Sequence, residues 1–243
     1  MENQQVEILG IPFTGGTRVD FINKRLKPRI MNGEKTFIVT ANPEIVELAV
    51  HDPEYRININ HADYIVPDGI GIIVASRMLK QPLQERITGF ETMLDLFTLA
   101  DANGLKVYML GAQEHVVKRA AEKVKTEYPG LILAGWHHGF FDVEKDALAS
   151  EIASLEPDLI FVATGAPRQE KWIALHQGKF KKGLFMGVGG CFDILGGELK
   201  GAPPLWKKYH AEWLYRLLEQ PSRWRRMLAI PRFLVRVAKS RKM

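Results

Sequence analysis

Short apolar segments alternate with longer amphipathic ones along the first 193 residues, and this alternation limits the possible folds more than any other feature. The apolar segments are rich in Val, Ile and Phe and bounded by Gly, Pro or Asp, which is typical of buried strands. Strands are predicted at 6–11, 36–40, 64–66, 106–110, 131–135, 159–163 and 184–188. Helices are predicted at 43–50, 70–79, 92–102, 115–125 and 145–154. The alternation predicts an α/β fold with a Rossmann-like, mostly parallel sheet flanked by helices.

The character of the chain changes after residue 197. Ala202-Pro203-Pro204 interrupts it, a helix-like stretch follows over 205–219, and Pro231 is predicted at the first position of a last helix. We therefore predict two parts. Residues 1–197 form the α/β domain that carries the functional site, and residues 198–243 form a basic, amphipathic helical appendage.

This appendage is basic, whereas the body is mildly acidic. Residues 200–243 hold 12 Lys and Arg against 2 acidic residues, and the remainder holds 21 basic and 26 acidic residues. One side of the predicted last helix is basic (Arg232, Arg236, Lys239) and another is apolar (Phe233, Leu234, Val237). Such a helix suits a membrane surface, so residues 205–243 are expected to associate with anionic lipid. In one alternative, this segment binds a phosphorylated polymer. In the other, it is an ordinary surface helix with a homo-oligomer contact.

The first residues and the cysteine content predict a cytoplasmic location. The N-terminus has neither a basic nor an apolar signal-peptide region, and the most apolar stretches are too short to span a bilayer. Cys191 is the single cysteine, so no intramolecular disulfide forms, which favours a reducing compartment. A soluble or peripheral protein is expected.

Two junctions between a predicted strand and the next helix carry polar residues suited to a ligand site. In open α/β sheets ligands bind beyond the carboxyl ends of the strands. Thr40 and Asn42 follow one strand, and Asn42 is either a helix N-cap or a site residue. Asp68 follows the next strand, before Gly69, and is either a helix N-cap or a general base.

Two later junctions suit a phosphorylated ligand. Residues 164–172 place small residues before a polar helix start, where free N–H groups and Arg168 favour an anion. The turn at 187–190 is rich in glycine and permits close backbone contact, yet it matches neither the dinucleotide fingerprint nor the phosphate loop of NTPases. His137 and His138 are adjacent and point to opposite faces of a strand, so no metal site is predicted there.

Six motifs in order resemble the WecG/TagA/CpsF family of glycosyltransferases, and the similarity runs from about residue 8 to the end of the chain. The motifs occupy residues 40–44, 67–71, 85–89, 137–141, 165–172 and 187–190. The resemblance implies inverting, metal-independent transfer of N-acetylmannosamine from UDP-ManNAc. The implied acceptor is the 4-hydroxyl of GlcNAc on undecaprenyl diphosphate, the product is the teichoic acid linkage disaccharide, and no cofactor is implied. Donor sugars such as the uronic acid UDP-ManNAcA or UDP-glucose stay open.

The resemblance also implies roles for individual residues. Asp68 is the expected base, with Thr40 and Arg86 as further catalytic residues. The implied substrate-binding residues are Asn42, Gly69, Gly111, Arg168, Gln169, Gly187, Gly189, Arg216, Arg223 and Arg226. The tail arginines among them are expected to close over the diphosphate. Since the acceptor is anchored by its polyprenyl chain, the enzyme is expected to lie on the inner face of the cell membrane.

Two other function classes compete with this interpretation. A nicotinamide-dependent oxidoreductase would use the same kind of sheet, but the dinucleotide fingerprint is missing. A nucleic-acid-binding protein would use a basic, aromatic tail, and three of the five tryptophans do lie there. The polar strand ends of the body and the amphipathic last helix disfavour this alternative, so no nucleic-acid partner is expected.

Overall fold

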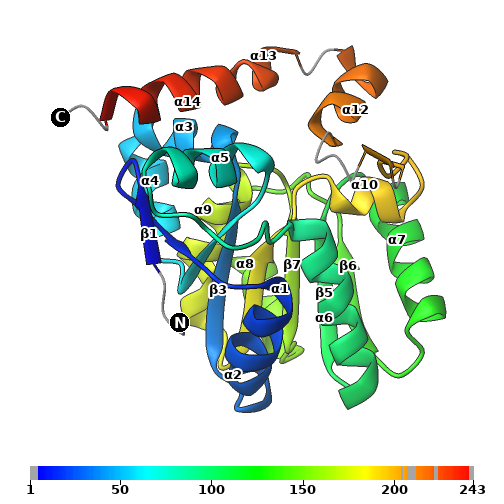
Figure 1. The fold of residues 1–243 in the computed structure, drawn as a ribbon. Coiled ribbons are helices and arrows are strands. Elements are labelled where there is room, and N and C mark those ends of the chain that lie inside the picture. Colours follow the sequence, from blue (N-terminus) through cyan, green and yellow to red (C-terminus); the bar gives the residue numbers. More distant parts are fainter. Residues whose placement is uncertain (1–4, 204, 207–211, 222–223, 241–243) are drawn as a thin grey trace.

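The chain forms a six-stranded parallel sheet with helices on both faces, in a computed structural model that describes residues 5–203, 205–206, 212–221 and 224–240 (Figure 1). The strand order is β4-β3-β8-β7-β5-β6, and each neighbouring pair is parallel. The strands are β3 (Lys35–Ala41), β4 (Tyr64–Pro67), β5 (Lys106–Gly111), β6 (Ile132–His137), β7 (Leu159–Ala163) and β8 (Gly183–Gly187). The predicted α/β architecture is confirmed.

Helices cover the two faces of the sheet and bury a separate apolar core on each. Alternate residues of β3 show the division, since Phe37 and Val39 join one core and Ile38 joins the other. The first face carries α3 (Pro43–His51), α4 (Pro53–Asn60), α5 (Ile70–Met78), α8 (Asp146–Ser154), α9 (Arg168–His176) and α14 (Ala229–Ser240). The second carries η1 (Phe21–Leu26), α2 (Lys27–Met31), α6 (Gly89–Asn103), α7 (Glu114–Glu127) and α10 (Cys191–Leu195). The short elements are α1 (Arg18–Asp20), η2 (Gln177–Lys179), α12 (Glu212–Glu219) and α13 (Trp224–Met227).

The connections after β3 and β8 leave the sheet in opposite directions. These strands are neighbours, yet α3 follows β3 on one face and α10 follows β8 on the other. In doubly wound sheets such a switch point opens a crevice at the carboxyl ends of the strands. A ligand site is therefore favoured beyond Ala41 and Gly187.

The first predicted strand, at 6–11, is wrong in its extent. Residues 5–14 form an antiparallel hairpin outside the main sheet, with β1 (Gln5–Ile8) paired to β2 (Ile11–Thr14). Leu9 and Gly10 both adopt positive φ, at 53° and 76°, and make a two-residue turn whose twist suits a hairpin. The chain therefore reverses in the middle of the predicted strand.

The last helix packs on the body through its apolar side. In Figure 1, α14 lies over α3 and α5. Phe233 and Val237 of this helix are fully buried, and Arg236 donates to Glu47 Oε1 of α3 at 3.0 Å. The helix begins at Ala229, so Pro231 lies at its third position and not at its first, still within the turn where a missing N–H costs no helical hydrogen bond. In the described part of the chain, no helix combines the length and apolarity needed to cross a bilayer.

Candidate active site

A cavity of about 330 Å³ opens at the switch point of the sheet. The ends of β3, β4 and β8 form its floor, and residues of α12, α13 and α14 form part of its wall. It is lined by most of the predicted site residues, namely Thr40, Asn42, Asp68, Gly69, Arg86, Gln169, Gly187 and Gly189. Five of the six sequence motifs thus meet at one cavity, whereas the motif at 137–141 contributes no residue to its lining.

Asp68 lies between the end of β4 and the start of α6. Its Oδ2 accepts a hydrogen bond from the Gly89 N–H at 3.2 Å, and the side chain is partly exposed to the cavity. The predicted alternative, in which Asp68 caps the following helix, is wrong because the N-cap of α5 is Gly69, without a side-chain cap. A carboxylate held by one backbone donor at a cavity wall can act as a proton acceptor.

Thr40 lies beside Asp68 on the neighbouring strand. Its hydroxyl donates to the Gly187 carbonyl at 3.4 Å, which joins β3 to β8 at the cavity floor. A Cβ atom at Gly89 would lie 3.0 Å from Thr40 Oγ1 and 3.7 Å from Asp68 Oδ2. Glycine at position 89 therefore keeps the space between the two side chains, a role that sequence analysis did not assign.

Asn42 is the N-cap of α3, one of the roles that the sequence left open, and its role in binding stays a prediction. Its Oδ1 accepts from the Ile45 N–H at 3.0 Å, which makes it the N-cap of α3, and it also lines the cavity. The side chain is therefore already held by the helix that it caps.

Gln169 connects α9 to the turn at Gly187–Gly190, which we call the glycine turn. Its Oε1 accepts from the Gly189 N–H at 3.0 Å, and its Nε2 donates to Glu170 Oε1 at 2.7 Å. A Cβ atom at Gly187 would lie 2.6 Å from Gln169 Nε2. Only glycine fits there, so the turn and the amide pack as one unit.

Arg86 closes the cavity through an ion pair with the tail. Both terminal nitrogens donate to the Glu212 carboxylate of α12 at 2.7 Å, and the two side chains are only 14% and 17% exposed. Burial alone lowers the pKa of Arg86, but hydrogen bonds and negative charge from Glu212, with further charge from Asp68 and Glu91, outweigh it and raise the pKa. The guanidinium therefore carries its charge at every physiological pH and fixes α12 over the site.

Two of the predicted binding residues lie outside the cavity. Arg168 donates from one nitrogen to the carbonyls of Gly139 and Phe141, at 3.2 and 2.8 Å, and so holds the loop after β6. Gly111 has a φ of 135°, and a Cβ atom there would lie 2.4 Å from the Ala163 carbonyl carbon. Close packing between β5 and β7 therefore explains why position 111 is a glycine. A role of either residue in binding stays a prediction.

The three predicted tail arginines are placed only in part. Arg223 lies outside the described residues. Arg216 belongs to α12 and Arg226 to α13. The structure describes the helical backbone at these two positions but not their side chains. Their contact with a diphosphate stays a prediction.

Several cavity residues were missed by the sequence analysis. Glu212, Trp213, Met227 and Ile230 all come from the tail, and Cys191 comes from α10. The available signal was Glu212, one of only two acidic residues among twelve basic ones. An isolated acid in a basic segment indicates a specific cationic partner.

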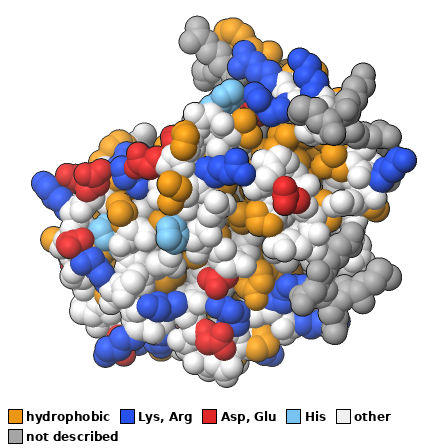
Figure 2. Space-filling model, turned by 90° about the vertical axis from the view of Figure 1, so that its left-hand side faces the viewer, with side chains coloured by type: hydrophobic (Ala, Val, Ile, Leu, Met, Phe, Trp, Pro, Cys, Tyr) orange, Lys and Arg blue, Asp and Glu red, His pale blue; other side chains and the backbone are white. Residues whose placement is uncertain are grey.

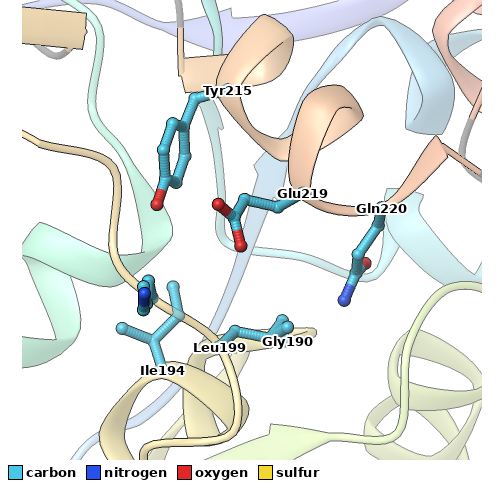
Figure 3. A pocket seen from close by; sticks show the side chains of 7 residues that line it. Gly190, Ile194, Leu199, Tyr215, Glu219 and Gln220 are labelled. Atoms are coloured by element: carbon cyan, nitrogen blue, oxygen red, sulfur yellow. The ribbon is translucent and has the colours of Figure 1, made fainter.

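A second, smaller hollow of about 40 Å³ lies where α12 faces α10 and the segment after it. In Figure 3, Tyr215 and Glu219 project from α12 toward Ile194 and Leu199. Burial and the nearby Glu219 both raise the pKa of Tyr215, so its phenol stays protonated. This contact is a second place where α12 touches the body.

The prediction that His137 and His138 point to opposite faces of a strand is wrong. The strand β6 ends at His137, and the two rings stand 4.3 Å apart, with His137 Nδ1 2.8 Å from the His138 carbonyl oxygen. Within the residues that the structure describes, no group of three His, Cys, Asp or Glu side chains is arranged to hold a metal.

The fold and the site define a doubly wound α/β protein whose cavity, lined by both polar and apolar residues, lies at the switch point of a parallel sheet. The sequence model of the "Glycosyl transferase WecG/TagA/CpsF family" matches residues 6–243, and the chain belongs to this family.

Two relatives carry the name N-acetylglucosaminyldiphosphoundecaprenol N-acetyl-beta-D-mannosaminyltransferase. The protein from Bacillus spizizenii is 39% identical over 230 residues, which cover 91% of this chain and 89% of the relative. The protein from Staphylococcus aureus is 40% identical over 240 residues, which cover 98% and 94%. The similarity therefore includes both the sheet and the tail.

Proposed function

We propose that this protein transfers N-acetylmannosamine from UDP-ManNAc to the 4-hydroxyl of GlcNAc-diphosphoundecaprenol, with inversion. The names of two relatives at about 40% identity, aligned over nearly the whole length, support this donor sugar and this acceptor. The observation that carries the proposal is the cavity in which Asp68, Thr40, Arg86 and Gln169 meet. Donors such as UDP-ManNAcA or UDP-glucose are less well supported, because these relatives are named for N-acetylmannosamine.

Asp68 is the proposed general base. Inverting transfer needs one base that takes the proton of the acceptor hydroxyl as the sugar moves to it. Asp68 projects into the cavity beside Thr40, and the Gly89 N–H holds one oxygen of its carboxylate. The carboxylate therefore has a fixed orientation before the acceptor enters.

The leaving UDP needs positive charge and backbone donors. The start of α5 lines the cavity at Gly69–Gly71 and has no side-chain cap, so its first N–H groups favour an anionic oxygen. Arg86 adds a guanidinium at the same wall. We propose that Arg216, Arg223 and Arg226 complete this charge when the tail covers the bound donor.

The tail is the proposed membrane contact. Apolar side chains of its described part are exposed, among them Leu218 at 63%, Trp224 at 53% and Val235 at 56%. Lys and Arg side chains gather near the top of the molecule in Figure 2, beside apolar ones. Basic and aromatic residues together suit the interface of an anionic bilayer, where a polyprenyl-linked acceptor resides. We therefore propose a peripheral position on the inner face of the cell membrane.

The test is an assay of UDP release with a short-chain GlcNAc-diphospholipid and each donor in turn, with and without excess EDTA. We expect release with UDP-ManNAc that depends on the acceptor and persists in EDTA. Faster release with UDP-ManNAcA or UDP-glucose would reassign the donor. Loss of activity in EDTA, restored by Mg²⁺ or Mn²⁺, would contradict the proposed arginine-based stabilisation of the leaving group. No acceptor-dependent release with any donor would refute the proposal.

A further inference from the structure

Glu170 is a buried carboxylate directly behind the cavity. It lies in the first turn of α9 and is 1% exposed, and no lysine or arginine pairs with it among the described residues. Burial raises the pKa of Glu170 to about 7, although hydrogen bonds from Gln169 and its own N–H act in the opposite direction. An unpaired buried carboxylate destabilises a fold, so its presence calls for a specific role.

The contact between Glu170 and Gln169 determines which way the Gln169 amide points. Glu170 Oε1 accepts from the amide both when the carboxyl is ionised and when its proton is on the other oxygen, Oε2, so Nε2 faces Oε1, at 2.7 Å. The Gly189 N–H can only donate, so Gln169 Oε1 must face the glycine turn, at 3.0 Å. Both partners require the same orientation, and the flipped amide would lose both hydrogen bonds.

The same network reaches the proposed catalytic residues. Gln169 holds Gly189, and the carbonyl of Gly187 accepts from Thr40, which stands next to Asp68 across Gly89. Nε2 of Gln169 carries two hydrogens, and the bond to Glu170 uses one of them. The other can serve a ligand of the cavity that Gln169 lines.

We infer that Glu170 is a positioning residue for the transfer reaction, which sets the orientation of the Gln169 amide and holds the glycine turn in place for the nucleotide-sugar donor. The inference rests on the proposed function, because it takes the ligand at this turn to be the UDP-sugar. Glu170 itself is buried behind the cavity wall and acts only through Gln169.

The first test compares Glu170→Met with Glu170→Gln. Methionine has a similar size but offers no oxygen to the amide, whereas glutamine keeps one acceptor oxygen. We expect E170M to raise the KM for UDP-ManNAc and the Kd for UDP by roughly tenfold, the loss typical of one hydrogen bond at a charged group. The Gln variant is expected to lose much less. Tyr55→Phe is the control, because it removes the phenol beside Glu170 without touching Gln169, and its KM should stay within about twofold of the wild-type value.

The second test uses an exchange of the two side chains, and it does not depend on E170M folding. Gln169→Glu places two carboxylates in contact and should weaken UDP binding strongly. In the double variant Q169E/E170Q, one acceptor again meets one donor and the glycine turn is held again, but the carboxylate that Q169E introduces has no hydrogen for the ligand, so we expect the UDP affinity to recover only in part, above that of Q169E. In a Q169A background, E170M should cause no further loss, because its partner is absent.

Four outcomes separate the possibilities. Rescue in the exchanged pair, with no added effect of E170M on Q169A, supports the inference. Normal donor KM in folded E170M, or additive losses with Q169A, would overturn it and leave Glu170 a structural residue. A double variant that binds UDP no better than Q169E would also overturn it. If the wild-type protein neither binds UDP nor turns over a UDP-sugar, the proposed function fails, and this inference fails with it.

Discussion

Asp68 carries the chemical step in the proposed reaction. Asp68→Asn keeps the size of the side chain and an oxygen for the Gly89 N–H, but it removes the base. We expect kcat to fall by about 10²–10⁴-fold, while the Kd for UDP changes little. Asp142→Asn, at an exposed position outside the cavity lining, is the control and should keep normal turnover. Near-normal kcat in D68N would remove Asp68 from the mechanism.

Glu170 makes stability depend on pH. Its pKa is raised by burial from 4.5 to about 7, so the folded state binds this proton more tightly than the unfolded state. The proton on Glu170 therefore stabilises the folded state fully below about pH 4.5. This stabilisation is lost as the pH rises through 7, which lowers the free energy of unfolding by roughly 3 kcal/mol. Urea unfolding at pH 5 and pH 8 should show this loss in the wild type and a smaller one in E170Q, whose amide does not titrate. Equal pH dependence of stability in both proteins would contradict the raised pKa of Glu170.

At the residue scale, the polar residues at the strand ends could be predicted from the sequence, but the buried residues that hold the site in place could not. Thr40, Asn42 and Asp68 were predictable because parallel strands bring their carboxyl ends to one edge. Glu170 was not, since its burial depends on α4, a helix whose pattern was not recognised. Arg168 attracted attention by its charge, yet its guanidinium holds the loop after β6.

The ion pair between Arg86 and Glu212 joins α12 to the body. Glu212→Gln weakens this pair, whereas Glu122→Gln removes the same charge from an exposed position on α7. We expect E212Q to lower turnover by roughly tenfold, as a partly buried charged hydrogen bond is lost. Trypsin should cleave the tail several-fold faster in E212Q than in E122Q. Equal cleavage and equal turnover in the two variants would show that the pair does not hold α12.

The last helix belongs to the packed core as well as to the tail. Phe233→Ala should lower the free energy of unfolding by about 3–5 kcal/mol, because it empties a fully buried site under α14. Val235→Ala, at a position 56% exposed, should change it by less than about 1 kcal/mol. Urea denaturation measures both. A mild effect of F233A would mean that α14 separates from the body without cost.

At the element scale, long periodic helices and apolar strands were predictable, and contacts between distant segments were not. The hairpin of β1 and β2 escaped because Leu9-Gly10 lacks the Asn-Gly or Asp-Gly signal of a tight turn. The apolar side of α14 was expected to face lipid, but Phe233 and Val237 face the core. An amphipathic pattern shows that a helix has an apolar side and does not show what covers it.

For the whole molecule, the central claim is that the switch-point cavity and the tail that closes it form one active site for a lipid-linked acceptor. Arg86 and Glu212 are 126 positions apart in sequence and meet at the cavity wall. This arrangement places the sheet's polar strand ends beneath a basic, aromatic segment that suits a membrane surface.

The most direct test is to identify the product made from UDP-ManNAc and a short-chain GlcNAc-diphospholipid. We predict a lipid heavier by one N-acetylhexosamine, with a β-1,4 linkage by NMR that is inverted relative to the donor. The wild type should make it, and D68N should make little. A lipid of unchanged mass with the wild type, a product of retained configuration, or equal yields from wild type and D68N would contradict the account.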